Sequence, residues 1–312
     1  VRAEHTYAHR LAKICEDMEE LGITSQRLGD RMVASELPRS QQLDRICEAA
    51  EGDVIGPDIS SCGIPSMSSH KIRFLINNIC AIMNGTYVEV GCWHGTSLLS
   101  ASIGNTGTYI GIDNLSEKFS ASLTSGASLS DETSDKVIRA HWGIIRDYLG
   151  DRSRFIEKSY EDIDPLSFGP ISVYYYDGLH TEEAQRDGLL HFFPGLDDEA
   201  IVLVDDYDNP AVRRGTSAAL EQFDGEVLWS KILGSNHPVP NTTLMDEAGW
   251  WGGFFVALLK RGEGSYEQIV HNSEGQTLSP RNNGVDSKVE EKWEAVGVEV
   301  GEAESAEEGI VG

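Results

Sequence analysis

The feature that most constrains the fold of this chain is a regular alternation of short apolar runs with segments of helical periodicity. Runs typical of strands occupy residues 86–90, 108–112, 154–157, 171–176 and 200–204. Segments whose apolar residues recur every three or four positions occupy residues 70–83, 98–103, 132–148 and 211–223. Strands that alternate with helices in this way form a parallel sheet with helices on both faces, so the sequence predicts an α/β fold.

The last two predicted strands break this alternation. Residues 226–229 and 253–259 both have the pattern of strands, but the segment between them is rich in Gly, Pro and Asn and has no helical period. This pattern predicts an antiparallel pair that closes one edge of the sheet.

Three regions are expected along the chain. Residues 1–68 are predicted to be a helical N-terminal appendage, with helices near 3–21 and 39–50. Residues 69–262 hold the alternating pattern and are predicted to be the catalytic domain. Residues 263–312 form a polar tail that carries nine acidic residues and two lysines from Asp286 onward, a composition typical of partial disorder.

The charge of the chain limits its partners. Asp and Glu outnumber Lys and Arg by 51 to 25, a formal net charge of −26. Such an excess argues against nucleic acid as a partner and against a polybasic membrane anchor. No run of about 18 apolar residues occurs, so a membrane-spanning helix is not expected. The five cysteines have no CxxC spacing, and we expect a cytoplasmic protein without a disulfide framework.

A glycine-containing segment follows the first predicted strand and leads into a helix. It contains Glu89, Gly91 and Gly95, and the helix begins near Thr96 and Ser97. Two glycines let the backbone turn tightly and approach a ligand, and the amides of a helix start can hold an anion. Asp113 ends the second strand, where a carboxylate can accept hydrogen bonds from ribose hydroxyls. A purely structural turn with a helix-capping Asp113 is the alternative, but the combination favours a ligand site.

Acidic residues end two later strands that should be neighbours in the sheet. Asp177 follows one of them, with His180 three residues on, and Asp205 and Asp206 follow the next. Three carboxylates at one crevice repel each other unless they are protonated or bound to a cation. Oxygen ligands suit Mg²⁺ or a similar divalent ion. The alternatives are a cofactor or turn contact for Asp177 and a helix cap for Asp205.

The glycine segment and its spaced acid resemble those of class I S-adenosylmethionine-dependent methyltransferases, over about residues 70–260. The resemblance implies a Rossmann-like sheet of seven strands whose last strand is antiparallel. It further implies that Glu89, Gly91 and Gly95, with Thr96 and Ser97, hold the methionine end of the cofactor. Asp113 would hold the ribose. Ser159 and Tyr160 would lie near the adenine.

The pattern D-G-x-H-T-x-E-A with a later V-D-D-Y is similar to that of metal-dependent small-molecule O-methyltransferases, especially the macrocin O-methyltransferase type. This resemblance implies that Asp177, Asp205 and Asp206 are metal ligands, that His180 with Asp177 is catalytic, and that the acceptor is a hydroxyl of a natural-product or sugar-like molecule. A structural hydrogen bond from His180 to a carboxylate is the competing role. A metal-independent N- or C-methyltransferase and a non-catalytic interaction module are the alternative functions.

Other aromatic and histidine residues have less definite roles. His94 is expected to position the backbone of the glycine segment, and His141 and His191 are expected to be ordinary surface or core residues. Trp250 and Trp251, after a loop over 231–248 that resembles a lid, could stack on a substrate or pack in the core. The N-terminal helices could form a homo-oligomer.

Overall fold

The computed structural model describes residues 36–52, 56–57, 59, 62–116, 131–234 and 249–262, with only the backbone given for 131–133. The helix predicted near 3–21, most of the 231–248 loop and the acidic tail lie outside these ranges. The homo-oligomer through the N-terminal helices stays a prediction. None of the helices within the described ranges has the length and apolar character needed to cross a bilayer.

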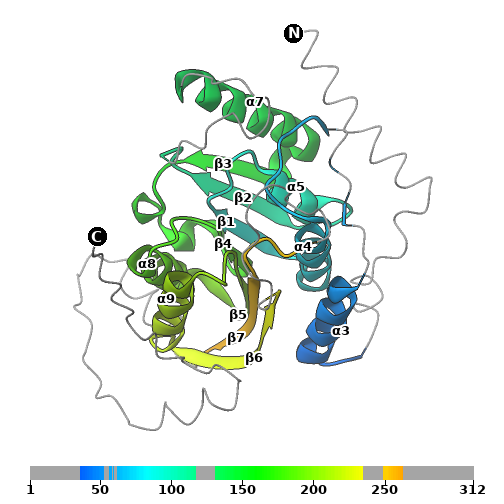
Figure 1. Ribbon diagram of the computed structural model, residues 1–312, viewed down its shortest axis with the longest axis vertical. Helices are drawn as coiled ribbons and strands as arrows, with labels where there is room; N and C mark the ends of the chain where they lie inside the picture. The colour runs from blue at the N-terminus through cyan, green and yellow to red at the C-terminus, as the bar shows by residue number, and fades with distance from the viewer. Residues whose placement is uncertain are drawn as a thin grey trace, which may run out of the picture. The chain divides into compact units, whose positions relative to one another are not determined.

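The described residues form one sheet of seven strands in the order β3-β2-β1-β4-β5-β7-β6 (Figure 1). The strands are β1 (Thr86–Val90), β2 (Thr108–Asp113), β3 (Ser153–Glu157), β4 (Ile171–Tyr176), β5 (Leu196–Val204), β6 (Gly225–Leu233) and β7 (Phe254–Arg261). The first five are parallel, and β7 runs antiparallel to both β5 and β6. The predicted α/β fold, seven strands and antiparallel closing strand are confirmed.

Helices cover both faces of this sheet. They are α3 (Arg39–Glu51), α4 (His70–Met83), α5 (Thr96–Ser102), α7 (Asp131–Leu149), α8 (Glu182–Phe192) and α9 (Pro210–Leu220), with 3-10 turns at Gly150–Arg152, Tyr160–Asp162, Pro165–Phe168 and Phe193–Gly195. Apolar residues of α3, α4, α5 and α7 belong to one core cluster with side chains from the sheet. Helices α8 and α9 lie side by side on the other face (Figure 1).

The alternation of side chains along β4 shows how the two faces are filled. Tyr175 belongs to the cluster beneath α4 and α5, whereas the ring of Tyr174 stacks on Phe192 of α8 with centroids 4.8 Å apart. Both tyrosines are almost fully buried. Because period-two alternation places successive side chains on opposite faces, β4 is buried on both sides, as expected of a central parallel strand.

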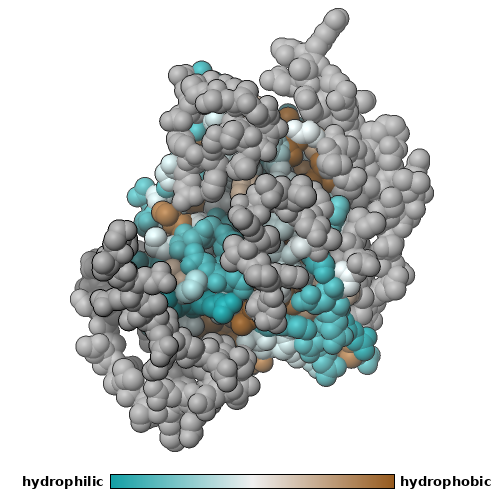
Figure 2. Space-filling model, viewed as in Figure 1, coloured by the Kyte–Doolittle hydropathy of each residue, from teal (hydrophilic) through white to brown (hydrophobic). Residues whose placement is uncertain are grey.

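Helix α3 packs on the sheet through its apolar side. Leu43, Ile46 and Cys47 are buried in the main core cluster, while the outward side is polar, as the teal surface at the lower right of Figure 2 shows. Indole nitrogens also reach α3, since Trp229 Nε1 donates to Asp44 Oδ1 at 3.0 Å and Trp250 Nε1 donates to Glu51 Oε2 at 3.2 Å. Trp250 therefore packs in the core, one of the two roles that the sequence left open.

Two strands are longer than predicted. β5 begins at Leu196 rather than at residue 200, because Leu196 pairs with Ile171 of β4 and Glu199 pairs with Lys260 of β7. β6 continues to Leu233 because Ile232 and Leu233 pair with Phe255 and Phe254. Polar residues at the start of a strand conceal that start from a pattern based on apolar runs.

The strand order reverses between β1 and β4. β1 pairs with β2 on one side and with β4 on the other, and the chain crosses from one half of the sheet to the other between them. Open α/β sheets bind ligands at the carboxyl ends of the strands at such a switch point. The glycine segment, Asp113 and Asp177 all lie at these ends.

Candidate active site

Gly91 joins the carboxyl ends of three strands. Its N–H donates to Ile112 O at 2.9 Å, and the N–H of Asp177 donates to Val90 O at 2.9 Å. Gly91 has φ of 87°, and a Cβ there would lie 1.8 Å from the carbonyl oxygen of Asp177. Only glycine fits this position, because both the left-handed conformation and the close approach exclude a side chain.

Glu89 lies behind the glycine segment rather than in the cavity. Its side chain is fully buried, accepts a hydrogen bond from Tyr87 Oη at 2.7 Å and accepts another from Ser97 Oγ. Burial raises the pKa of Glu89 to about 7, and the two hydrogen bonds oppose that rise. Glu89 thus ties β1 to the start of α5.

Gly95, Thr96 and Ser97 are also buried. Gly95 has φ of 81°, and a Cβ there would press on Ile145 and Phe155 at 3.0 Å. Of the residues predicted for the methionine end of the cofactor, Gly91 alone lines the cavity, while the other four form the support beneath it.

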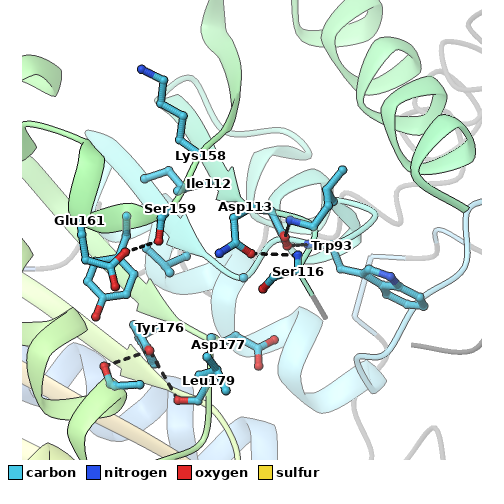
Figure 3. Close-up of a pocket in the computed structure, with 17 residues that line it drawn as sticks. Trp93, Ile112, Asp113, Ser116, Lys158, Ser159, Glu161, Tyr176, Asp177 and Leu179 are labelled. Atoms are coloured by element: carbon cyan, nitrogen blue, oxygen red, sulfur yellow. Dashed lines mark hydrogen bonds between the residues drawn. The ribbon is translucent and has the colours of Figure 1, made fainter. Parts of the chain in front are cut away.

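The cavity at the switch point brings together residues predicted to bind the cofactor and one residue predicted as a metal ligand. Gly91, Asp113, Ser159, Tyr160 and Asp177 all line it (Figure 3). Asp113 Oδ2 accepts from the N–H of Trp93 at 2.8 Å, and Asp113 Oδ1 accepts from the N–H of Leu115 at 2.7 Å. The hydroxyl of Ser159 bonds the carboxylate of Glu161, another lining residue. Tyr160 presents its ring to Tyr176, with centroids 6.3 Å apart.

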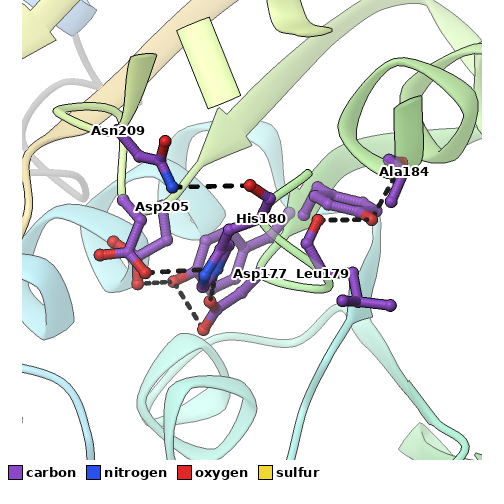
Figure 4. Close-up of polar contacts among 9 residues, drawn as sticks. Asp177, Leu179, His180, Ala184, Asp205 and Asn209 are labelled. Carbon is purple, nitrogen blue, oxygen red and sulfur yellow. Dashed lines mark hydrogen bonds and ion pairs between the residues drawn. The ribbon is translucent and has the colours of Figure 1, made fainter. Parts of the chain in front are cut away.

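The acidic residues that follow β4 and β5 meet beside this cavity (Figure 4). His180 Nε2 lies 3.2 Å from Asp206 Oδ2 and 3.7 Å from Asp177 Oδ1. Asp177, His180 and Asp206 each offer one ligand atom, and these atoms lie within 4.8 Å of one another. We call Asp177, His180, Asp205 and Asp206 the acidic corner.

Asp205 lies next to this group but is held differently. Its Oδ2 accepts from Tyr175 Oη at 3.0 Å, and the same hydroxyl is 3.5 Å from Asp177 Oδ2. Its Oδ1 is buried and has no hydrogen-bond partner among the residues that the structure describes. The sequence predicted three aspartates as a ligand set, whereas the group of facing ligand atoms in the structure has His180 in place of Asp205. The ligand set itself stays a prediction.

Burial and mutual repulsion disfavour the ionised carboxylates. The pKa of Asp177 is raised well above its usual range by burial first and then by the charges of Asp206 and Glu89. The pKa of Asp205 is raised well above its usual range by burial and by Asp177 and Asp206. Burial also raises the pKa of Asp206, while His180 lowers it.

The donor set of the acidic corner fits a divalent cation. Its carboxylates are buried against like charges, and Asp205 Oδ1 has no donor from the described protein; both features favour a bound positive charge. Carboxylate oxygens suit Mg²⁺ or Mn²⁺, and an imidazole nitrogen in the set would favour transition metals over Mg²⁺. Asp177, Asp206 and either Asp205 or His180 are the residues that would hold the ion.

A pair of glycines supports the loop that carries Asp206. Asp206 has a left-handed φ of 50°, and a Cβ at Gly252 would lie 2.2 Å from its Oδ1. The N–H groups of Tyr207 and Asp208 donate to the carbonyls of Gly253 and Gly252 at 3.2 and 2.6 Å. This support was not predicted from the sequence, although a Gly-Gly pair just before a strand is a signal for close backbone approach.

The three histidines His94, His141 and His191 make specific polar contacts. His94 Nδ1 and His141 Nδ1 are 2.8 Å apart. Burial first, and then the charge of His141, lowers the pKa of His94 to about 3. His191 Nε2 lies 2.7 Å from Ile163 O, and its ring meets Tyr160 edge-on. His141 contacts the glycine segment from a helix about 47 positions away, which no local pattern could indicate.

Comparison with known proteins agrees with this geometry. Residues 88–207 match the family model described as a methyltransferase domain. The match covers the glycine segment, Asp113 and both acidic segments, and the prediction of a methyltransferase of the class I fold is confirmed. No protein of curated function matches the sequence.

Solved structures similar to this chain include three methyltransferases. The O-methyltransferase TomG from Streptomyces achromogenes, involved in tomaymycin synthesis and solved with SAM, is 10 % identical, with 72 % of this chain and 100 % of that chain covered and a TM-score of 0.45. A Podospora anserina methyltransferase bound to SAH is 16 % identical, with coverages of 72 % and 99 % and a TM-score of 0.44. An O-methyltransferase from Bacillus cereus in complex with SAH is 13 % identical, with coverages of 73 % and 94 % and a TM-score of 0.43.

Proposed function

We propose that this chain, which contains a methyltransferase domain, transfers a methyl group from S-adenosylmethionine to a hydroxyl of a small natural-product or sugar-like molecule, with a divalent cation such as Mg²⁺ bound at the acidic corner. One observation carries the proposal. Asp177 lines the cavity at the switch point and also belongs to the group of facing ligand atoms. A donor in the cavity and an acceptor at the corner would therefore meet at one residue.

The donor is proposed to lie along the cavity from Gly91 to Tyr160. Gly91 leaves the strand ends open to the methionine end, and Asp113 accepts hydrogen bonds from the ribose hydroxyls. A carboxylate has about four acceptor sites, so Asp113 can hold both the ribose and the backbone amides that already bind it. Tyr160 and Ser159 border the adenine end of the same cavity.

The acceptor is proposed to bind at the acidic corner. Asp177 and Asp206, with Asp205, would hold the cation there. The cation would lower the pKa of an acceptor hydroxyl toward neutral pH. Asp205 is kept in place by Tyr175, and the backbone at Asp206 is supported by Gly252 and Gly253. These supports fix the carboxylates before any ligand arrives, which reduces the cost of binding.

His180 is proposed to act as the base. Its unprotonated Nε2 accepts the proton of the acceptor hydroxyl as the oxygen attacks the methyl carbon. The bond between carbon and sulfur breaks, and its electron pair stays on sulfur, which becomes a neutral thioether. Asp177 and Asp206 lie 3.7 and 3.2 Å from Nε2 and stabilise the imidazolium that results.

The competing role for His180 is that of a metal ligand, and one variant separates the two roles. His180→Gln should lower turnover by about 10²–10⁴-fold while the affinity for Mn²⁺ stays unchanged if His180 is the base. Loss of Mn²⁺ affinity in the same variant would instead make His180 a ligand.

A metal-independent transferase is the second candidate, and the raised pKa values of Asp177 and Asp205 favour it, since protonated carboxyls can orient an acceptor without a cation. The test is turnover, measured as S-adenosylhomocysteine released with a panel of sugars and polyketide-like alcohols, before and after EDTA treatment. Loss in EDTA and recovery with Mg²⁺ support the metal-assisted proposal. Full turnover in EDTA supports the second candidate.

A further inference from the structure

Trp93, inside the glycine segment, has a strained backbone that is held from both sides. Its φ is 40°, a left-handed value that is unfavourable for a residue with a large side chain. Its N–H donates to Asp113 Oδ2 at 2.8 Å, and its carbonyl accepts from Trp142 Nε1 of α7 at 2.6 Å. The conformation that brings the Trp93 amide to Asp113 is thus opposed by strain and retained by a side chain of α7.

The next residue of the segment makes a second contact with the same helix. His94 Nδ1 lies 2.8 Å from His141 Nδ1, so one ring donates and the other accepts. Consecutive residues of the glycine segment, Trp93 and His94, are therefore bonded to consecutive residues of α7, Trp142 and His141. We call these two bonds the α7 clamp.

The clamp is fixed firmly on the side of the helix. The ring of Trp142 is 6 % exposed and stacks on Phe155 of β3, with centroids 5.2 Å apart and planes 10° from parallel. Phe155 also packs against Gly95 at the far end of the glycine segment. A buried, stacked indole has little freedom to follow the Trp93 carbonyl if the segment relaxes.

We propose that Trp142 and His141 are positioning residues for the methyl donor. They hold Trp93 and His94 in the conformation that orients Asp113 toward the donor's ribose, although neither touches the donor. This inference rests on the proposed function, since it assumes that S-adenosylmethionine binds above Gly91. It differs from that function because it assigns part of the donor affinity to a helix outside the glycine segment.

The experiment is calorimetric titration of the full chain with S-adenosylhomocysteine. Trp142→Phe keeps a ring for stacking on Phe155 but removes the indole N–H, and it should weaken binding about tenfold. Trp229→Phe is the matched control, because it removes an indole bond to Asp44 far from the cavity, and it should leave the affinity unchanged. His141→Phe should weaken binding in the same direction, and thermal unfolding checks that each variant is folded.

A double variant tests whether the effect passes through Asp113. If the clamp orients Asp113, Trp142→Phe should cost much less affinity in an Asp113→Asn background than in the wild type. With a methyl acceptor present, the clamp variants should raise the KM for the donor and leave kcat nearly unchanged.

The outcomes separate the inference from the function on which it rests. If the wild-type chain binds no S-adenosylhomocysteine, the proposed function fails and the clamp assignment fails with it. If the wild type binds and folded Trp142→Phe and His141→Phe bind equally well, the clamp assignment alone is overturned. Equal losses from Trp142→Phe and Trp229→Phe also overturn it, because the effect would then be one of general stability.

Discussion

The glycine segment and the acidic corner border the same cavity, but their polar groups are satisfied in opposite ways. In the glycine segment, Glu89 accepts two hydrogen bonds and the Trp93 carbonyl accepts an indole N–H, and beside it Asp113 accepts hydrogen bonds from two backbone N–H groups. In the acidic corner, carboxylates face one another, and Asp205 Oδ1 has no partner among the described residues.

This difference indicates what each region can bind. The glycine segment is internally complete, so it offers a preorganised surface to a ligand that adds a few hydrogen bonds. The acidic corner is electrostatically incomplete, and a positive charge or protons would stabilise it. The two regions should therefore respond to different substitutions.

The largest expected effect concerns turnover. Asp206→Asn removes a carboxylate that faces His180 and does not itself line the cavity. The variant should lower turnover by at least about 100-fold because a ligand of the cation is lost. The affinity for S-adenosylhomocysteine should stay within about threefold. A parallel loss of donor affinity would show that the two regions are not separable.

The corresponding variant on the donor side of the cavity is Asp113→Asn. Its binding is measured by titration with S-adenosylhomocysteine and with Mn²⁺. Loss of the charged acceptor should weaken donor binding by about 10–100-fold, the range for hydrogen bonds to charged groups. Mn²⁺ binding should not change, since Asp113 lies outside the group of facing ligand atoms. Unchanged donor affinity would remove Asp113 from the donor site.

Glu89 should make the stability of the chain depend on pH. Its pKa is about 7 in the folded protein and near 4.5 when exposed, so the folded state holds the proton more tightly. Its contribution to the free energy of unfolding therefore falls as pH rises from about 4.5 to 7 and is level above that. Between pH 5 and pH 8, the free energy of unfolding of the wild type should fall by about 2–3 kcal/mol more than that of Glu89→Gln, as measured by urea unfolding. Parallel pH curves for the two proteins would contradict the assignment.

Tyr175 should have a smaller effect on the acidic corner. Tyr175→Phe removes the hydroxyl that bonds Asp205 and should weaken Mn²⁺ binding about tenfold, as loss of an outer-sphere hydrogen bond does. Tyr174→Phe is the matched control, because its hydroxyl bonds Gly188 O on the opposite face of the sheet. Equal Mn²⁺ affinity in both variants would leave Tyr175 with a packing role only.

Much of the fold and part of the site could be predicted from the sequence. β4 was predictable because five apolar or aromatic residues lie among its six, and Asp177 follows directly, so the position of that carboxylate at a strand end was also predictable. Gly91 was predictable because a left-handed turn between a strand and a helix selects glycine. These features depend on residues close to one another along the chain.

What could not be predicted depends on contacts distant in sequence or on local backbone geometry. Trp142 and His141 meet Trp93 and His94 across nearly 50 positions, and nothing near either pair indicates the other. The left-handed conformation of Asp206 decides that its side chain, and not that of Asp205, faces His180. The polar start of β5 was missed because only its pairing with β4 and β7 makes it part of the strand.

The central claim is that the acidic corner binds a divalent cation, and titration of the full chain with Mn²⁺, followed by electron paramagnetic resonance, tests it most directly. Asp187→Asn is the matched control, since it removes one exposed carboxylate, paired with Arg186, outside the corner. The wild type and Asp187→Asn should bind one ion with equal affinity. Asp206→Asn should bind it at least about tenfold more weakly. No binding by the wild type, or equal binding by Asp206→Asn, would contradict the account.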